Sequence, residues 1–333
     1  MTRALVVGAA VSALAMGVGC TVPDVVTGRA AQRRLYLATD SMGVVPATAV
    51  MIRLQARPEL VENSGATLSL SQPGVFFTIN DSENEPLLFA FDSSGADRGV
   101  WRVAGVPNVD WEAASAGPCV APAPNVRVLP CVYVGEVGDN EANRPTRAIY
   151  KVIEPPAQRA GFVGNVTPIA LVYRYADGPR DVEAMYAAPN GDMFLITKRR
   201  LLDASGRLRP ALVYALPASL WSADSVVVAT LVDSLPIIPG SAPMRQITDA
   251  ALSPDGRHLA VRTYAQVYIF ATDSITGRVN HAVPPSACNI VAFDRWPGEG
   301  VAWFGRNGRL LLTSEGHESP LVSIACPLPS GTE

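Results

Sequence analysis

Apolar and polar residues alternate along most of this chain in short runs that end at Gly, Pro, Asn or Asp. The stretch CVYVGEVGDNE, residues 131–141, is apolar at every second position and then breaks into Gly, Asp, Asn and Glu. Alternation with a period of two is typical of half-buried β-strands, and the breaking residues are typical of turns. The sequence therefore predicts an all-β chain built from many short strands.

One order of segments recurs five times along the chain. The first segment of each unit begins with a polar or acidic residue, passes through small and apolar residues, and ends at a Gly or Pro turn. These first segments are ELVENSGATLSLSQPG, NVDWEAASAGP, RDVEAMYAAPNG, QITDAALSPDG and CNIVAFDRWPG. Three further strands are predicted after each; GRVNHAV is expected as the fourth strand of the fourth unit, and GVAWFGRNG, RLLLTS and PLVSIACP complete the fifth.

Four antiparallel strands that recur as a unit are the pattern of a β-propeller. We therefore predict a single propeller domain over residues 33–333, made of four-stranded antiparallel blades. Five blades can be counted, and TAVMIRLQARP, residues 48–58, could close the ring or begin a sixth. A sandwich or a pair of β domains would also give many short strands, but neither explains why every first strand starts with polar residues.

The N-terminus has the features of an export signal. Arg3 precedes the apolar run ALVVGAAVSALAMGVG, which has the length of a signal-peptide core and is short for a membrane span. We expect residues 1–19 to be a signal peptide and residues 20–32 a tether. Two routes stay open: lipid attachment at Cys20, giving a membrane-anchored lipoprotein of the cell envelope, or cleavage after Ala15, giving a secreted protein.

The composition narrows the choice of partner. Only 17% of the residues are charged, and the net charge is -3. With no basic stripe beyond residues 198–200, the chain lacks the electrostatic grip that nucleic acid binding requires. We expect a monomer whose partner is a small molecule or a peptide.

Four cysteines remain after Cys20, an even number in an exported chain, so disulfides are expected. Cys119 and Cys131 would join the two ends of a hairpin connection. Cys288 and Cys326 are the second predicted pair, although strands about 4.8 Å apart leave non-neighbours out of range unless loops bend together. A zinc site is the weaker alternative, because the histidines are scattered.

Topology predicts a polar funnel on one face of the propeller. In each blade the first strand begins at the face where the second strand ends, because neighbouring strands are antiparallel. The polar residues at first-strand starts are Glu62, Asp110, Glu112, Asp181, Glu183 and Asp249. Those at second-strand ends are Asn80, Asp81, Asp139, Asn140, Lys198 and Arg262.

Several of these positions fall in short motifs with a fixed order: NDS at 80–82, DWE at 110–112, GDN at 138–140, DVEA at 181–184, and SPDG at 253–256 followed by VRTY at 261–264. In this order the motifs resemble a family of bacterial exported β-propeller proteins. More distantly, the chain is similar to the phytase-like and gluconolactonase-like propellers, in which acidic and amide side chains hold calcium over the central channel. The chain departs from its family at Glu83, where Gly is more usual, and in its cysteine pairs. The resemblance implies a metal or polar-ligand site at Asp110, Glu112, Asp139, Asn140, Asp181 and Glu183.

The residues themselves point to a cation as well. Asp110 with Glu112, and Asp181 with Glu183, each place two carboxylates on the same side of an ideal strand, and like charges so close need a cation or a shared proton. Calcium, a hard ion that takes about six to eight oxygen ligands, is the expected cofactor, with magnesium a weaker candidate. The alternative is an ion-pair network closed by Lys198 and Arg262. The expected metal ligands are Asp110, Glu112, Asp139, Asp181 and Glu183.

Two functions follow from this funnel. The first is an exported binding or scaffolding protein that holds a small molecule or peptide. The second is a calcium- or magnesium-dependent hydrolase of phosphoester or lactone type, in which the cation polarises the bond and an Asp or Glu serves as general base. The sequence shows no nucleophile elbow and no Ser/His/Asp triad, and none of its three histidines is placed in the funnel. These features favour the first function.

Overall fold

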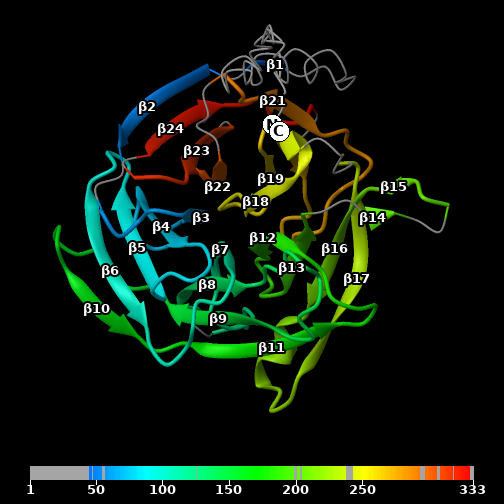
Figure 1. The fold of residues 1–333 in the computed structure, drawn as a ribbon, viewed down its shortest axis with the longest axis horizontal. Helices are drawn as coiled ribbons and strands as arrows, with labels where there is room; N and C mark the ends of the chain where they lie inside the picture. Colours follow the sequence, from blue (N-terminus) through cyan, green and yellow to red (C-terminus); the bar gives the residue numbers. More distant parts are fainter. Residues whose placement is uncertain are drawn as a thin grey trace, which may run out of the picture. The chain divides into compact units, whose positions relative to one another are not determined.

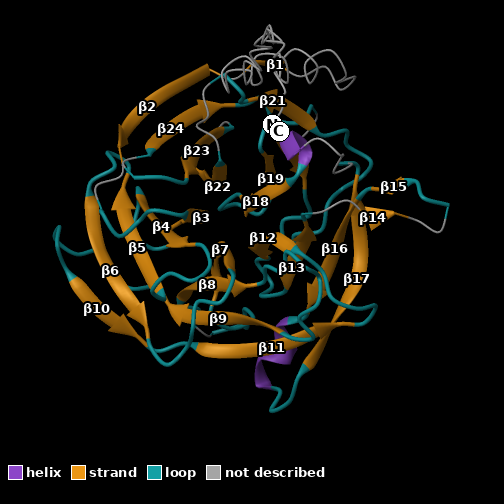
Figure 2. Ribbon diagram, in the orientation of Figure 1, coloured by secondary structure: helices purple, strands orange, loops and turns teal. Residues whose placement is uncertain are grey.

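The alternating runs of the sequence form β-strands separated by turns (Figure 1). The computed structural model describes residues 45–46, 48–54, 57–125, 127–198, 201–202, 205–237, 243–292, 297–305, 308–317 and 319–330. The predicted signal peptide, the tether and Cys20 lie outside these residues. Within them the helices are two short 3-10 segments, η1 (Ala218–Ser222) and η2 (Pro243–Arg245) (Figure 2), and neither is long and apolar enough to cross a membrane.

Most of the strands are arranged in five antiparallel meanders of four strands each. The first strands of the meanders are β3 (Asn63–Leu68), β7 (Trp111–Pro118), β12 (Val182–Ala187), β18 (Ile247–Leu252) and β22 (Gly298–Trp303). The second strands are β4 (Val75–Asn80), β8 (Pro130–Glu136), β13 (Met193–Thr197), β19 (His258–Thr263) and β23 (Arg309–Ser314). The third strands are β5 (Leu87–Asp92), β9 (Arg147–Ile153), β16 (Ala211–Leu216), β20 (Gln266–Ala271) and β24 (Pro320–Ala325).

The fourth strands complete the meanders and link some of them. They are β6 (Asp97–Val103), β11 (Ile169–Tyr175), β17 (Val227–Leu235), β21 (Ser286–Asn289) and β2 (Thr48–Leu54). Parallel pairing of β11 with β17 joins the second and third meanders into one eight-stranded sheet. Two short strands, β10 (Val163–Val166) and β1 (Val45–Pro46), add parallel edges to β6 and β21, and β14 (Leu201–Leu202) pairs with β15 (Leu208–Arg209).

The meanders follow one another around a common centre. The first strands of consecutive meanders lie next to each other, including β22 beside β3, and Figure 1 shows these strands innermost. A separate apolar cluster fills each space between consecutive meanders: Phe77 of the first packs in one cluster with Trp111 of the second. The series returns to its start, because Phe76 of the first meander packs with Leu311 and Leu321 of the fifth. The prediction of an all-β chain is confirmed, and the arrangement is propeller-like.

The predicted strands of the last repeat are each displaced by one position in the meander. The segment CNI at 288–290 was expected to begin a first strand, but Cys288 and Asn289 end β21, the fourth strand of the fourth meander. GRVNHAV, expected in that place, forms only an isolated bridge through Val279. Consequently GEGVAW is the first strand of the fifth meander, and RLLLTS is its second. The N-terminal segment TAVMIRL closes this last sheet as β2, which was one of the two options left open.

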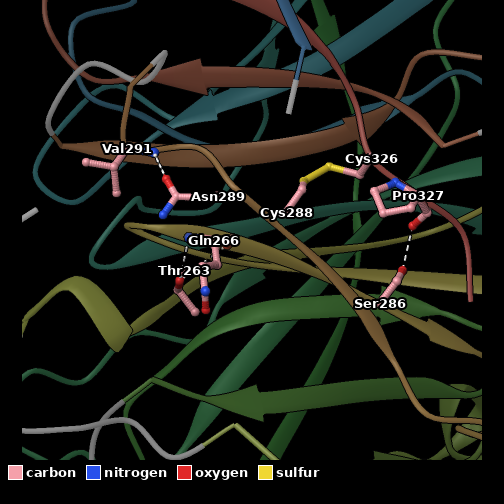
Figure 3. Close-up of a disulfide and its surroundings, with 8 residues drawn as sticks. All are labelled: Thr263, Gln266, Ser286, Cys288, Asn289, Val291, Cys326 and Pro327. Carbon is pink, nitrogen blue, oxygen red and sulfur yellow. Dashed lines mark hydrogen bonds between the residues drawn. A yellow bond between two sulfur atoms is a disulfide. The ribbon is translucent and has the colours of Figure 1, made fainter. Parts of the chain in front are cut away.

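Both predicted cysteine pairs are joined. Cys119 and Cys131 connect the end of β7 to its neighbour β8. The Cys288–Cys326 disulfide links the outer strand β21 to the residue that follows β24, so it connects two different sheets (Figure 3). The Ser286 hydroxyl supports the same junction by donating to the Pro327 carbonyl oxygen at 2.5 Å. Cys288 and Cys326 come within disulfide range because they lie on adjacent sheets. Non-neighbouring strands of one sheet would be too far apart.

Candidate functional site: an acidic funnel

Each of the five first strands carries a β-bulge near its start. The register against the second strand shifts between Ser64 and Ala66, Trp111 and Ala113, Val182 and Ala184, Ile247 and Asp249, and Gly298 and Val301. The residues without a cross-strand partner are Gly65, Glu112, Glu183, Thr248, Glu299 and Gly300. A bulge bends its strand and re-aims the extra side chain. The simple alternation predicted for Asp110 with Glu112 and for Asp181 with Glu183 is therefore broken at both glutamates.

The bulged glutamates Glu112, Glu183 and Glu299 are buried and share one ammonium group. Each side chain belongs to a residue no more than 4% exposed. Lys198, which follows β13, donates a hydrogen bond to Glu183 Oε1. Burial lowers the pKa of Lys198, but the carboxylates of Glu183, Glu112 and Glu299 with the Tyr264 hydroxyl raise it above its usual value. Lys198 therefore stays protonated among the three glutamates.

The three carboxyl groups are strongly perturbed. Burial raises the pKa of Glu183 to about 7, even though Lys198 opposes that shift. Burial and the neighbouring Glu183 also raise the pKa values of Glu112 and Glu299 well above the usual range. One ammonium cannot compensate three negative charges, so the site favours proton uptake or a further cation.

Hydrogen bonds fix two of these glutamates. The Ser64 hydroxyl donates to Glu112 Oε2 at 2.8 Å, and the Tyr264 hydroxyl donates to Glu299 Oε1 at 3.0 Å. The second oxygen of Glu299, Oε2, is buried and accepts no hydrogen bond from the described residues. A buried carboxylate oxygen without a donor is costly. Glu299 thus offers an oxygen to a ligand or ion.

Asp81, Asp110 and Glu112 form a tighter carboxylate cluster. One oxygen from each lies within 4.8 Å of the other two. Burial, the Asp81 charge and other acidic neighbours raise the pKa of Asp110 to about 6, while Arg144, with Nη1 3.7 Å from Asp110 Oδ2, lowers it. Burial also raises the pKa of Asp81. The cluster has the donor set of a hard cation site.

The backbone of Gly138 presses against this cluster. A Cβ atom added to Gly138 would lie 2.6 Å from Asp110 Cγ and 2.7 Å from Glu112 Cγ. Glycine is therefore required here for close approach of the GDN segment to the two carboxylates. This contact connects the 131–141 stretch to the funnel.

Asp139, from the same segment, has a structural partner. Its carboxylate forms an ion pair with Arg147, and both side chains are 1% exposed. It also accepts the backbone N–H of Arg144 at 3.0 Å. The Asp139 N–H in turn donates to Asp181 Oδ1 at 3.1 Å, which ties the 139 loop to the start of β12. Asp139 and Asp181 are thus placed near the funnel, with Asp139 held by the chain itself.

Asp249 and Arg262 are fully buried and bind backbone groups. Asp249 accepts N–H groups from Ala66 in β3 at 3.0 Å and from Val301 in β22 at 2.8 Å. Burial raises the pKa of Asp249 well above its usual value, while those N–H groups and Arg262 act in the opposite direction. Arg262 donates to the carbonyl oxygens of Gly300 and Thr313. The pair holds three first strands together.

The remaining predicted funnel residues lie at the rim or support it. Asn80 is buried, and its side chain accepts the N–H groups of Val61 and Glu62 at 3.2 Å, so it holds the backbone before β3. Glu62 is exposed and accepts from Asn84 at 2.5 Å. Asn140 is exposed. None of these three joins the carboxylate cluster.

Sequence reasoning missed two acidic residues of the funnel. Glu299 begins the true first strand of the fifth meander, and Glu315 follows its true second strand. Burial with the charges of Asp81 and Glu62 raises the pKa of Glu315 to about 7. Both residues obey the predicted rule that polar residues of the funnel lie at first-strand starts and second-strand ends. With the last repeat placed correctly, the segments GEGVAW and TSEG would have identified them. His317 lies in the same β23–β24 connection and is exposed.

No protein-family model and no curated protein matches the chain. Among solved structures it is similar to the Myxococcus xanthus glutaminyl cyclase, at 13% identity and a TM-score of 0.41 over 85% of this chain and 99% of that one. It is also similar to the PQQ-bound aldose sugar dehydrogenase of Streptomyces coelicolor, at 11% identity and a TM-score of 0.43 over 84% of this chain and 98% of that one. A luciferin-regenerating enzyme matches at 9% identity and a TM-score of 0.41, over 84% of this chain and 95% of that one. Likenesses this distant give no support to any activity or ligand for this chain.

Proposed function

We propose that the protein is an exported binding or scaffolding protein, a single propeller of five blades, whose acidic funnel binds a small-molecule or peptide ligand through calcium. The observation that carries the proposal is the cluster of Asp81, Asp110 and Glu112, whose carboxylate oxygens lie within 4.8 Å of one another. Calcium would be held by these three residues, with the ligand supplying further oxygens.

The residues fit calcium by charge and by chemistry. Three carboxylates offer up to six oxygen atoms, and calcium accepts about six to eight at flexible geometry. Glu112 of this cluster also shares the Lys198 ammonium with Glu183 and Glu299. Glu299 Oε2, which accepts no hydrogen bond from the described residues, is a second observation that supports a partner in the funnel. Magnesium fits less well, because it requires a near-ideal octahedron.

Calorimetric titration of chelator-treated protein with calcium chloride tests the proposal. We expect one calcium per chain, and we expect Asp110→Asn and Glu112→Gln each to weaken binding by about tenfold or more. Gly138→Ala should do the same with every carboxylate retained, because its Cβ would displace Asp110 and Glu112. Asp224→Asn, an exposed change in the β16–β17 connection at the opposite face, is the matched control. Equal binding by all four variants, or none by the parent protein, would overturn the proposal.

Export and anchoring belong to the proposal as well. Two disulfides support an extracytoplasmic location, because such bonds persist in oxidising compartments. Lipid attachment would fall on Cys20, outside the described residues. Cys20→Ser should move the protein from the membrane to the soluble fraction; an unchanged distribution would contradict lipid attachment at Cys20.

A hydrolase is the second candidate, and the observation in its favour is the pKa of Glu183. A carboxyl group with a pKa of about 7 is suited to proton transfer near neutral pH. Bound calcium would supply polarisation of a phosphoester or lactone, and Glu183 would accept the proton of the attacking water. Hydrolysis of p-nitrophenyl phosphate or of a simple lactone that needs calcium and is lost in Glu183→Gln, but kept in Asp224→Asn, would establish this function. No turnover of either probe would leave the binding function alone.

A further inference from the structure

A second pocket lies at the face opposite the funnel, between the second and third meanders. It has a volume of about 270 Å³. Its walls come from the end of β7, from β8 and β9, from the β12–β13 turn and from η1. The residues that matter for its chemistry are Pro118, Val120, Tyr133, Lys151 and Trp221.

Lys151 is the charged group of this pocket, and its surroundings are neutral. The residue is 7% exposed, and its ammonium donates to the Cys119 carbonyl oxygen at 2.9 Å. The same nitrogen lies 4.1 Å from the centre of the Trp221 ring. A carbonyl dipole and an aromatic face attract a cation, but neither carries a negative charge.

No described carboxylate forms an ion pair with Lys151. The ammonium has three donors, and the carbonyl of Cys119 uses one. Burial alone lowers the pKa of Lys151, and no neighbouring charge raises it. A buried cation without a counter-ion is unfavourable, and a bound anion would relieve that penalty.

The apolar side chains of the pocket restrict the size and the chemical character of the anion. Tyr133 and Trp221 lie with ring centres 5.6 Å apart at a tilt of 49°, and the Tyr133 hydroxyl is engaged by the Pro118 carbonyl at 2.5 Å. These rings and the side chain of Val120 form the apolar part of the lining, and Ser219 and Ser222 of η1 add hydroxyl groups. Its volume is slightly below the range of about 300–1,000 Å³ that drug-sized ligands occupy, so a smaller ligand fits.

We propose that this pocket binds a small organic carboxylate with a flat apolar body, its carboxylate paired with Lys151 and its body against Tyr133 and Trp221. One negative charge matches one ammonium. A phosphate with two charges would leave one uncompensated among apolar walls. The proposal is independent of the calcium site, because the two sites lie on opposite faces.

Benzoate is the probe, titrated into the full-length protein and followed by calorimetry and tryptophan fluorescence. Benzoate should bind, whereas benzamide, which lacks the charge, should bind about tenfold more weakly or not at all. Lys151→Met should weaken benzoate binding by about tenfold or more, and Lys151→Arg should retain most of it. Arg159→Met removes an exposed cation elsewhere and should change nothing.

Calcium binding at the funnel shows whether each variant remains folded. A Lys151→Met chain that keeps calcium binding or its parent melting temperature but loses benzoate supports the proposal. Equal affinity for benzoate and benzamide, unchanged binding in Lys151→Met, or absence of benzoate binding by the parent would overturn it. Tighter binding of inorganic phosphate than of benzoate would overturn the assignment to carboxylates.

Discussion

Two sets of buried carboxylates differ in whether the chain supplies their hydrogen-bond donors and counter-charges. Asp139 and Asp249 are satisfied by the chain: the first by Arg147, the second by backbone N–H groups of two neighbouring strands. Glu112 and Glu299 share Lys198 with Glu183 and retain at least one oxygen, Glu299 Oε2, with no donor among the described residues. Burial is similar in the two sets, so burial does not distinguish them.

Asp139 and Asp249 hold loops and strands together, and we call them the satisfied set. Glu112, Glu183 and Glu299 have too few donors, and we call them the unsatisfied set. A carboxylate with its full set of donors has its charged form stabilised by those donors, although burial still raises the pKa of Asp249. One with too few donors destabilises the ionised fold until a proton or a cation arrives. Substitutions should therefore have opposite signs in the two sets.

The largest effect should come from breaking the satisfied pair. Arg147→Met leaves Asp139 buried and charged without its partner, and should lower the free energy of unfolding by about 3–5 kcal/mol. Denaturant titration measures the loss. Arg147→Met combined with Asp139→Asn should recover much of it, because the orphaned charge is gone. A single-variant loss below about 1 kcal/mol would mean that this ion pair does not hold the loop.

Removing Lys198 should also destabilise strongly, but only where the glutamates are ionised. Lys198→Met removes the ammonium that Glu112, Glu183 and Glu299 share, and at about pH 8 in chelator we expect a loss of about 3 kcal/mol. At about pH 5 the loss should shrink, because carboxyls with raised pKa values take up protons. A loss independent of pH would indicate that Lys198 acts through packing.

The unsubstituted protein in chelator should lose stability as the pH rises from about 4.5 to about 7. Glu183 has an ordinary pKa of 4.5 and a folded pKa of about 7, so the folded chain binds this proton more tightly than the unfolded chain. The stabilisation is fully present below the unfolded value and is lost through the folded value. We expect Glu183 alone to give a fall of about 2–3 kcal/mol. Glu112, Glu299 and Asp249, whose pKa values burial also raises, act in the same direction, and Asp110 and Glu315 add less because solvent screens them.

Calcium should flatten that pH profile, since it replaces the protons. Melting temperature against pH, with calcium and with chelator, is the measurement. Asp92 and Asp97 have lowered pKa values and act below about pH 4, outside this window. Stability that rises between about pH 4.5 and 7 in chelator would contradict the assignment of these glutamates to the unsatisfied set.

Smaller effects should reveal coupling within the unsatisfied set. In chelator, Glu112→Gln and Glu299→Gln should each raise the free energy of unfolding, because each relieves repulsion. The double variant should fall short of the sum by about 0.5–1 kcal/mol, since the same repulsion is removed twice. Denaturant titration of the four proteins gives the coupling energy. Strict additivity would mean that the two carboxylates do not share a site.

The smallest effect is expected at the rim. Glu62 is exposed, and Glu62→Gln should change the free energy of unfolding by less than about 0.5 kcal/mol. The same titration serves as the measurement. A larger change would mean that Glu62 at the rim also interacts strongly with the buried glutamates.

The sequence predicted the first three meanders and the first three strands of the fourth, because alternation and turns are local properties. The fifth was displaced because GRVNHAV alternates like a strand, although Gly277, with a φ of 66°, turns the chain there and leaves only one bridge. That displacement hid Glu299 and Glu315, which the topological rule would otherwise have placed in the funnel.

Which carboxylates are satisfied could not be predicted from the sequence. The bulges at Glu112 and Glu183 depend on the register of two strands, and the partners of Asp249 lie on β3 and β22, far away along the chain. Residue type and strand position gave the face on which the acidic residues gather. Only the packing of different meanders decided which of them the chain itself neutralises.

Closure of the last sheet by β2 has a consequence for the order of assembly. Thr48 pairs with Ala325, so β2, which is made before any of the five first strands, must wait for nearly the whole chain before its sheet can form. The entropy of joining such distant segments grows slowly with length, but non-local pairing is slow to form. During synthesis, four meanders can take shape while the fifth stays open. Strands from the first and last parts of the described chain therefore complete the ring together. Loss of the β2–β24 pairing would open the ring within the fifth sheet.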